Sequence, residues 1–483
     1  MKESLRSALE VVLEAAMRQG AEYVEVRSTA RDREVVSYKD GQLDGVFLED
    51  DCGVGVRALF GNGWGFASTN QLEPHALVEL AAEAVRAARA ACDTHRAAVA
   101  IPPAVSGTYT TSLVEDPLAV PLTEKLETFR SAHAKIRSGQ GIIGARGNSI
   151  AQRTHARFLA SNGSRIEQTV VLCGGGLTAI AQVDGEVQTR SAPKSHEGNV
   201  LQGGFEVFRG FDLEGQAERI REEALALARA PVTPAGETTV ILGGSQLSLQ
   251  IHESVGHPSE LDRALGEEIS LAGASFLLPE LLGSLQFGSE RVTLTADATT
   301  PLGPGTFGFD DEGTPAQSVK LVERGRFVGY LSGRDSAARI GTESGGAMRA
   351  ESWAALPIVR MVNVNLEPGQ GTLDDLIGGV DRGFLFENNK SWSIDDLRLN
   401  FQFSCEMARE IKGGKLTGRV FRNPVYSGVT PKFWGRCSGI AGPSEWEMWG
   451  WMFCGKGDPM QLIHVGHGCA PARFERVQVG LSR

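Results

Sequence analysis

Hydrophobic residues recur every three or four positions in several segments of the first half of the chain, a spacing typical of amphipathic helices. The first such segment begins near Leu5 and continues through Leu9 and Val12, and Gly20 stands where this helix would end. Three further helices are predicted over residues 74–91, 122–138 and 214–230.

Between these helices, hydrophobic and polar residues alternate, as they do in half-buried strands. The segment YVEVRST at residues 23–29 shows this alternation, and two longer runs flank the pair Asp40-Gly41. Because Asp-Gly favours a tight two-residue turn, these two runs are predicted to form a hairpin. The mixture of helices and strands predicts an N-terminal α/β domain with a mixed sheet over residues 1–233.

Pro231 and Pro234 end the last of these helices and mark a predicted domain boundary. Residues 234–483 open with a buried-type strand, TTVILGG, and continue in short alternating segments such as RFVGYLS, PIVRMVNVNLE, FQFSCEMAREI and KLTGRVF. This pattern predicts a strand-rich, antiparallel C-terminal domain. The fold class predicted for the whole chain is α+β.

The most informative chemistry of the second half lies in the segment IHESVGHPSE, residues 251–260. Its pattern, H-E-x-x-x-H, is one residue longer than the H-E-x-x-H signature of zinc peptidases. If His252 and His257 bind zinc, Glu253 is the carboxylate that would accept a proton from a zinc-activated water. The alternative is a pair of unrelated histidines near the end of a helix.

The helix that carries this motif follows a Gly-Gly-Ser segment at residues 243–245. A phosphate-binding loop would require the pattern G-x-x-x-x-G-K-[ST], which is absent, so Ser245 is predicted to be a helix N-cap. Leu247, Ile251 and Val255 are spaced four residues apart and are predicted to form the buried stripe of this helix.

On a regular helix, the extra residue would place His252 and His257 about 140° apart, too far to reach one metal ion. Gly256 tolerates left-handed geometry, and Pro258 disfavours helical geometry at the residue before it. We therefore expect the helix to end near Val255 and the chain to turn at Gly256. This turn would bring His257 back toward His252.

A catalytic zinc needs a third protein ligand, and spacing alone does not select it. The candidates are four nearby carboxylates and four distant histidine or cysteine side chains. They are Glu260, Asp262, Glu267, Glu268, His464, His467, Cys454 and Cys469.

Composition narrows the class of partner. Lys and Arg number 48 and Asp and Glu 59, which gives a net charge of −11. This charge argues against nucleic acid and anionic membranes as partners. No apolar run approaches the roughly 20 residues that span a bilayer, and Glu3 and Glu10 oppose a signal peptide. The 7 scattered cysteines are typical of a reducing compartment, so a cytoplasmic location is expected.

Several stretches, taken in order, resemble the TldD/PmbA family, specifically its TldD-like branch. They include GAEYVEVRSTA, DGVFLEDDCGVGVRALFGNGWGFAST, HESVGHPSE, FDDEGTPAQ, GYLSGRDSA and FCGKGD, and they extend over nearly the whole chain. The resemblance implies that His252 and His257 are zinc ligands, that Cys454 is the third ligand and that Glu253 is the catalytic general base.

The resemblance also implies a zinc metallopeptidase that hydrolyses unfolded or extended peptides. It implies a dimer, either of two copies of this chain or with a PmbA-like paralogue. The alternative function is a non-hydrolytic, peptide-binding partner subunit with a structural metal. The intact Glu253 favours the peptidase, because a structural site would not need that carboxylate.

Two further stretches have more than one interpretation. Asp310, Asp311 and Glu312 form either a solvated acidic turn or carboxylates that orient a ligand histidine. The tryptophans of residues 446–451 are candidates for a subunit interface or the lining of a channel, with burial in the core of one chain as the alternative.

Overall fold

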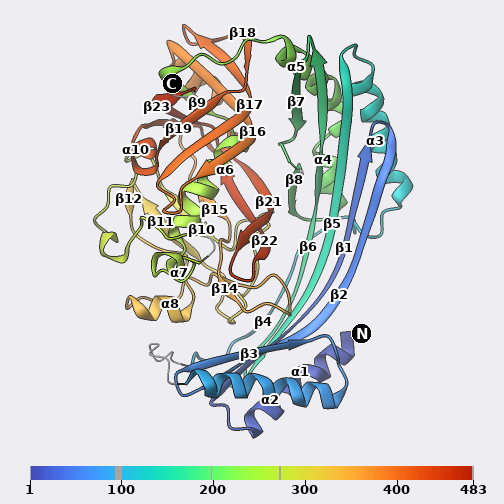
Figure 1. Cartoon of the computed structure of the whole chain (residues 1–483), viewed down its shortest axis with the longest axis vertical. Helices are drawn as coiled ribbons and strands as arrows, with labels where there is room; N and C mark the ends of the chain where they lie inside the picture. Colours follow the sequence, from blue (N-terminus) through green and yellow to red (C-terminus); the bar gives the residue numbers. More distant parts are fainter. Residues whose placement is uncertain (1, 93–100, 197, 271–272, 481–483) are drawn as a thin grey trace.

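The structure, a computed structural model, describes residues 2–92, 101–196, 198–270 and 273–480. Its fold is α+β, as predicted. Long strands of the N-terminal half curve along one side of the molecule, and a strand-rich C-terminal half lies against their concave side (Figure 1).

The N-terminal half is built on one eight-stranded mixed sheet of order β3-β2-β1-β5-β6-β4, with β7 and β8 also pairing with β6. The β4–β6 pair is parallel and the other pairs are antiparallel. The strands are β1 (Tyr23–Lys39), β2 (Gln42–Phe60), β3 (Gly63–Thr69), β4 (Ser106–Thr110), β5 (Ile142–Ala160), β6 (Arg165–Val183), β7 (Glu186–Ala192) and β8 (Asn199–Gln202).

The predicted hairpin at Asp40-Gly41 is confirmed. These two residues are the whole connection between β1 and β2, and their φ angles are 50° and 88°. A tight turn of this kind needs positive φ at both central residues, which glycine and aspartate tolerate best.

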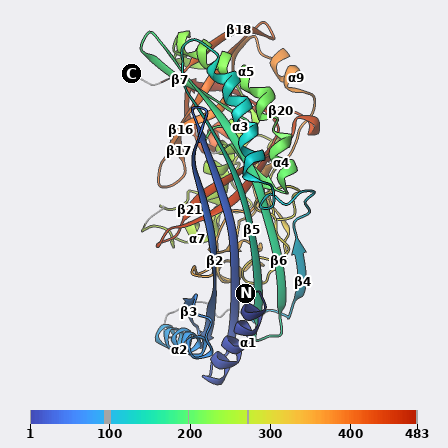
Figure 2. The ribbon, with the colours of Figure 1, turned by 90° about the vertical axis from the view of Figure 1, so that its right-hand side faces the viewer.

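Helices cover the outer face of this sheet. At one end of the long strands lie α1 (Lys2–Arg18) and α2 (Pro74–Ala91), and at the other end lie α3 (Leu122–Arg137), α4 (Phe205–Gly210) and α5 (Leu213–Arg229) (Figure 2). The helices predicted over 74–91, 122–138 and 214–230 are thus confirmed to within one residue at each end. Their buried apolar stripes pack on the sheet in two separate clusters, which leaves the inner face for the C-terminal half.

The C-terminal half contains a ring of five strands, β16-β9-β23-β19-β17, which the β16–β17 pairing closes into a barrel. The β9–β16 pair is parallel and the others are antiparallel, and β18 and β20 extend it. These strands are β9 (Gly236–Leu242), β16 (Arg382–Ile394), β17 (Asn400–Lys412), β18 (Lys415–Arg422), β19 (Val425–Val429), β20 (Cys437–Ile440) and β23 (Ala472–Val479).

Smaller elements surround the barrel. One sheet has the order β12-β11-β10-β15, and two hairpins are formed by β13–β14 and β21–β22. The strands are β10 (Leu294–Asp297), β11 (Ser318–Glu323), β12 (Arg326–Phe327), β13 (Met348–Arg349), β14 (Ile358–Val359), β15 (Val364–Leu366), β21 (Glu447–Lys456) and β22 (Gln461–Cys469). The helices are α6 (Gly244–Ile251), α7 (Leu261–Ala264), α8 (Arg334–Arg339), α9 (Leu373–Gly378) and α10 (Thr430–Gly435).

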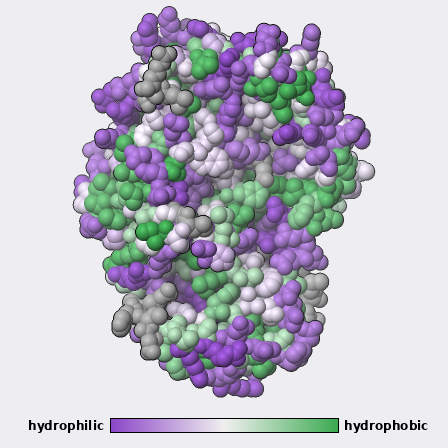
Figure 3. Space-filling model, viewed as in Figure 1, coloured by the Kyte–Doolittle hydropathy of each residue, from purple (hydrophilic) through white to green (hydrophobic). Residues whose placement is uncertain are grey.

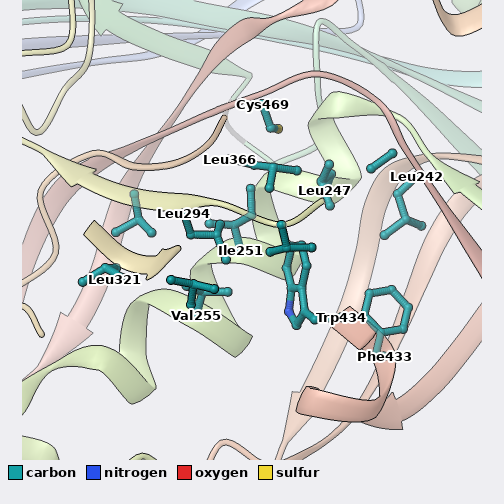
Figure 4. Close-up of a cluster of buried hydrophobic side chains, with 14 of the residues drawn as sticks. Leu242, Leu247, Ile251, Val255, Leu294, Leu321, Leu366, Phe433, Trp434 and Cys469 are labelled. Atoms are coloured by element: carbon teal, nitrogen blue, oxygen red, sulfur yellow. The ribbon is translucent and has the colours of Figure 1, made fainter. Parts of the chain in front are cut away.

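The predicted stripe of α6 is confirmed and lies at the centre of the largest hydrophobic core. Leu247, Ile251 and Val255 are fully buried. Leu294 and Leu366 of the small sheet lie beside them (Figure 4). This packing fixes the helix that leads into the histidine motif.

Two buried ion-pair clusters join the two halves. In the first, Arg190 of β7 bonds to Glu223 of α5 at 2.6 Å, to Glu387 of β16 at 3.1 Å and to Glu406 of β17 at 3.3 Å. Arg409 of β17 completes it with bonds to Glu223 and Glu387. The cluster ties the sheet and its outer helix to the barrel.

The second cluster lies near the other end of the long strands. Arg57 of β2 bonds to Glu25 of β1 at 2.9 Å and to Glu312 at 2.7 Å, and Arg334 of α8 contacts both carboxylates. Burial raises the pKa of Glu312, but the two arginines outweigh it and lower this pKa to about 2. The acidic stretch 310–312 is therefore neither a solvated turn nor a support for a ligand histidine. It docks the two halves.

Close backbone contact reinforces this second joint. The ring of Trp353 lies on β2, where a Cβ atom added to Gly53 would stand 2.3 Å from it. The indole Nε1 donates to Asp51 at 3.0 Å, and the backbone N–H of Trp353 donates to Thr29 Oγ1 at 2.9 Å. Glycine at position 53 is needed here because any side chain would displace the indole.

The surface is unevenly polar. Hydrophilic residues dominate both ends of the face shown in Figure 3, and hydrophobic residues gather around its middle. Within the described ranges, no helix has both the length and the apolar character that a membrane crossing requires.

Candidate metal centre

The histidine motif forms a π-helical turn directly after α6. Residues His252–Gly256 are π-helical, and the backbone N–H of His257 donates to the carbonyl oxygen of His252, five residues earlier. This i→i+5 pattern places residues five apart on one side of the turn. The two imidazole rings lie with their centroids 4.8 Å apart. The expected approach of His257 to His252 therefore occurs.

The backbone route to this approach differs from the predicted one. Gly256 has φ −59° and ψ −64°, and His257 has φ −59° and ψ −45°, so both are right-handed and helical. Pro258 is accommodated because it lies in the first turn of the short 3₁₀ helix that follows, where its missing N–H is not needed. Gly256 is needed for space, since an added Cβ would lie 2.2 Å from Met361 Sδ.

The predicted N-cap is also wrong. The N-cap of α6 is Gly243, with extended geometry, and the helix begins at Gly244. Ser245 lies inside the helix, and its hydroxyl donates to Asn388 Oδ1 at 2.7 Å. A buried acceptor on β16 thus replaces the local backbone partner that an N-cap serine would have.

Cys454 lies beside His252 and His257, and we call these three side chains the metal cluster. Cys454 lies on β21, and its Sγ is 3.9 Å from His257 Nε2. One ligand atom from each of His252, His257 and Cys454 lies within 4.8 Å of the others, and all three residues are buried. Zinc bonds of about 2.0–2.3 Å hold two ligand atoms less than about 4.5 Å apart, so small side-chain movements would suffice to enclose an ion.

Hydrogen bonds behind the histidines fix which ring nitrogen faces the cluster. His252 Nδ1 lies 2.8 Å from Nε2 of His467, and His467 Nδ1 lies 3.0 Å from the carbonyl oxygen of Val364. Because a carbonyl only accepts, His467 carries its proton on Nδ1 and its Nε2 accepts from His252 Nδ1. His252 therefore presents the unprotonated Nε2 as a ligand.

The second histidine is oriented by a carboxylate. His257 Nδ1 lies 3.0 Å from Glu260 Oε2, which also lies 3.7 Å from Lys456 Nζ and 3.3 Å from Arg263 Nη2. Burial raises the pKa of Glu260, but Lys456, His257 and Arg263 outweigh it and hold this pKa well below its usual range. The ionised carboxylate accepts from Nδ1, which frees the Nε2 of His257 for a ligand.

The protonation states suit a metal. Burial lowers the pKa values of His252 and His257, so both rings stay neutral. Burial alone would raise the pKa of Cys454, but His257 and Arg360 outweigh it and lower this pKa. Two neutral imidazoles and a cysteine prone to ionise form a donor set that fits zinc.

The other candidate ligands lie elsewhere. Asp262 binds Lys456 at 2.7 Å, Glu268 accepts from the backbone of Gly457, and Cys469 Sγ contacts the carbonyl of Gly244. Glu267 pairs with Arg339. Two of the candidates, His467 and Glu260, stand behind His252 and His257. His464 lines a separate pocket.

Glu253 lies on the π turn at the edge of a pocket of about 550 Å³ that also contains His252 and His257. Its Oε2 lies 3.4 Å from Nη1 of Arg398, in the connection between β16 and β17. Arg398 was not predicted. It has a left-handed φ of 62° in a surrounding stretch, SIDDLRLN, that resembles any polar turn.

The tryptophan-rich segment divides between core and pocket. Trp449 belongs to the main hydrophobic core, and Trp446 donates from Nε1 to the carbonyl of Leu366. Trp451 instead lines the pocket of about 550 Å³ that contains His252, Glu253 and His257, which we call the metal pocket. Its ring centroid lies 6.2 Å from that of His252. Lining of a cavity is thus observed for one of the three indoles, and interior packing for the other two.

Comparison with known sequences places this site in a family. Models of three domains match the chain: PmbA/TldA metallopeptidase domain 1 over residues 24–88, the central domain over 115–228 and the C-terminal domain over 235–481. The chain therefore belongs to the PmbA/TldD metallopeptidase family, as its sequence motifs predicted.

Several relatives are named metalloproteases, and the first two align over most of the chain. One from Methanothermobacter thermautotrophicus is 29% identical over 462 residues, 95% of each chain. A metalloprotease TldD homolog of Haemophilus influenzae is 27% identical and aligns over 90% of this chain and 89% of its own. A zinc metalloprotease TldD homolog of Saccharolobus solfataricus is 26% identical over 57% of this chain and 58% of its own.

Solved structures share the fold. TldE from Thermococcus kodakarensis superimposes with a TM-score of 0.72 at 18% identity, over 98% of this chain and all of that one. A protein from Thermotoga maritima gives a TM-score of 0.76 at 16% identity, over 99% of this chain and all of that one. The long sheet and the barrel are therefore the architecture of these proteins as well.

Proposed function

We propose that the protein is a zinc-dependent peptidase that hydrolyses extended segments of unfolded peptides. One observation carries the proposal: the two histidines and Glu253 open onto one pocket, with Cys454 in the same cluster. The metalloprotease names of the relatives support it.

The chain's own residues divide the work. His252, His257 and Cys454 would hold the zinc ion, which when bound supplies a Lewis acid that polarises the peptide carbonyl and acidifies water. Glu253 is outside the ligand set and next to His252, so it is assigned the role of general base. It would take a proton from the attacking water and return it to the leaving amine. Arg398 would keep the Glu253 carboxylate pointed at the pocket.

The shape of the pocket supports an extended substrate. It lies between the inner side of the N-terminal half, at Lys194, His196 and Gly198, and the β21 strand of the C-terminal half. A cavity of about 550 Å³ holds a few residues of a single chain and excludes a folded domain. Two aromatic side chains, Trp392 and Trp451, line it, and Lys194 lies over the ring of Trp451 at 3.9 Å.

The general base is tested by Glu253→Gln, which keeps the shape of the side chain and removes its basicity. We expect full zinc content and a loss of at least about 100-fold in kcat on an unstructured peptide, since a general base contributes about 10²–10⁴. Near-normal hydrolysis by this variant would show that Glu253 is not the general base.

The ligand set is tested by elemental analysis of Cys454→Ala. Cys437→Ala is the matched control, because Cys437 is an equally buried thiol outside the cluster whose Sγ contacts the carbonyl of Gly439. About one zinc per chain is expected for wild type and for the control, and markedly less for Cys454→Ala. Equal zinc in both variants would contradict the assignment.

A further inference from the structure

The metal pocket is one part of a longer cleft between the inner face of the N-terminal sheet and the C-terminal half. A neighbouring pocket of about 600 Å³ shares His196 with it. We call this neighbour the basic pocket. It is lined by cleft-facing residues of β1 and β5 and by parts of β6, β7, β16 and β17, among them Arg33, Lys39, Arg146 and Lys390.

Positive charge accumulates in the basic pocket although the chain as a whole carries −11. Its lining has four cationic side chains and two carboxylates, Asp44 and Glu406. Glu406 is engaged by other groups, since it pairs with Arg190 at 3.3 Å and accepts from Ser191 Oγ at 2.7 Å. Among the described residues, Lys39, Arg146 and Lys390 have no carboxylate within ion-pair distance.

Two of these cations are direct neighbours on adjacent strands of the sheet. Lys39 of β1 and Arg146 of β5 are direct cross-strand partners, and both side chains line the same pocket. Like charges directly opposite one another destabilise a sheet. Both residues are exposed, so water screens part of this repulsion, and an anion bound between the two side chains would relieve the rest.

Arg33 adds a guanidinium group with an unsatisfied hydrogen-bond donor. It lies on the same face of β1, six residues before Lys39, and its nearest ion pair, to Glu49, is long at 4.0 Å. Its Nε atom is buried and has no hydrogen-bond partner. A buried N–H without an acceptor is unfavourable, and an incoming carboxylate would satisfy it.

The basic pocket lies a short distance from the metal cluster. The ring of His196 is 6.1 Å from that of Trp451, which is 6.2 Å from that of His252. Because His196 lines both pockets, an extended peptide, which advances about 3.3 Å per residue, could run from one pocket into the other within a few residues.

From these observations we propose that the basic pocket binds a carboxylate of the peptide substrate, a few residues from the bond at the metal cluster. That carboxylate is either the C-terminus of the peptide or an Asp or Glu side chain. The position of the cleaved bond rests on the proposed function, whereas the binding of the carboxylate does not.

Binding is measured on zinc-loaded Glu253→Gln, so that the peptide stays intact. The probes are fluorescein-labelled alanine hexapeptides of three kinds: a free C-terminal acid, a C-terminal amide, and an amide with one internal Glu. We expect the better of the two carboxylate peptides to bind about tenfold more tightly than the neutral amide at low salt, and this ratio to shrink as salt rises. Equal affinity for all three would overturn the proposal.

The double substitution Lys39→Gln/Arg146→Gln, made in the same background, should lower this ratio to near one. Neither side chain makes an ion pair within the described residues, so the fold does not depend on them. Lys415→Gln, at the exposed start of β18, is the matched control and should keep the ratio. A double variant that retains the full ratio would refute the pocket.

The two peptide arms identify the source of the carboxylate. Tighter binding of the free acid assigns the pocket to the C-terminus, and tighter binding of the Glu peptide assigns it to a side chain. If the protein prefers carboxylate peptides but hydrolyses none of them, the proposed carboxylate site is supported and the proposed peptidase function is refuted. Hydrolysis by wild type without any preference in binding would do the opposite.

Discussion

The hydrogen bond from His252 to His467 leads to a quantitative prediction about zinc affinity. In His467→Phe, a ring of similar size replaces the imidazole, but no acceptor remains for the Nδ1–H of His252. That donor is buried, since His252 is 6% exposed and His467 is fully buried. The ring of His252 would then be free to turn or to move its proton to Nε2, the atom that faces the cluster.

The size of the effect follows from two independent estimates. A buried donor left without a partner costs about 1–3 kcal/mol, and loss of a group that orients a metal-binding histidine lowers metal affinity about 10–100-fold. At about 1.4 kcal/mol per tenfold change, the two ranges agree. We therefore expect the zinc dissociation constant of His467→Phe to rise about 10–100-fold.

Competition against a chromophoric chelator at fixed pH measures this constant directly, without reference to turnover. His464→Phe is the control, because His464 lies on the same strand and contacts neither ligand histidine. His467→Gln should recover part of the affinity, since its amide oxygen can accept. If His467→Phe binds zinc as tightly as wild type does, His467 does not orient His252.

Three further predictions concern the backbone, the joint between the halves and assembly. Gly256→Ala should destabilise the protein by about 1–3 kcal/mol in thermal unfolding, because its Cβ would meet Met361 Sδ at 2.2 Å. Measured against Met361→Ala as the starting protein, the same substitution should cost much less, and an equal cost in both backgrounds would mean that the strain lies elsewhere. Glu312 has a folded pKa of about 2, below its unfolded value, so its contribution to stability is present above about pH 4.5 and lost as the pH falls toward 2. Glu312→Gln should therefore reduce the fall of the urea unfolding midpoint over this pH window. A midpoint that falls as steeply in the variant as in wild type would contradict this. Light scattering should report a dimer, as expected from the family resemblance. Phe47→Glu should weaken this dimer, since Phe47 is 55% exposed on a stretch of β2 beyond its pairing with β3. A monomer at micromolar concentration would refute assembly.

Local patterns predicted the N-terminal half well. The helices α2, α3 and α5 and the Asp40-Gly41 hairpin depend on residues close in sequence, so periodicity and turn chemistry were sufficient. The segments RFVGYLS and PIVRMVNVNLE were predicted as strands, but within them only Arg326–Phe327, Ile358–Val359 and Val364–Leu366 form strands, and Leu331 and Asn363 make isolated bridges. Their backbones are engaged by irregular contacts, such as the bond from Arg360 N to the carbonyl of Ala347, that no alternation of residues reveals.

The site was predictable in its residue types and not in its geometry. His252, Glu253 and His257 stand out in the sequence, but their spacing does not predict the π-helical turn that aligns the histidines, and it does not show that distant Met361 leaves room only for glycine at position 256. Spacing also gave no reason to prefer Cys454 over His467, which lie on neighbouring strands of one hairpin. Only the packing of β21 and β22 against the motif shows which side chain joins the cluster and which stands behind it.

The two ion-pair clusters have a kinetic consequence. Because the Arg190 cluster and the Arg57 cluster clamp the halves at both ends of the long strands, widening the cleft would require breaking buried charges at one end. A folded protein would have to open by itself before a segment could reach the metal cluster. Under the proposed peptidase function, the degradation of such a protein should proceed at the rate of its own local unfolding once this chain is in excess, and adding more of this chain should not accelerate it.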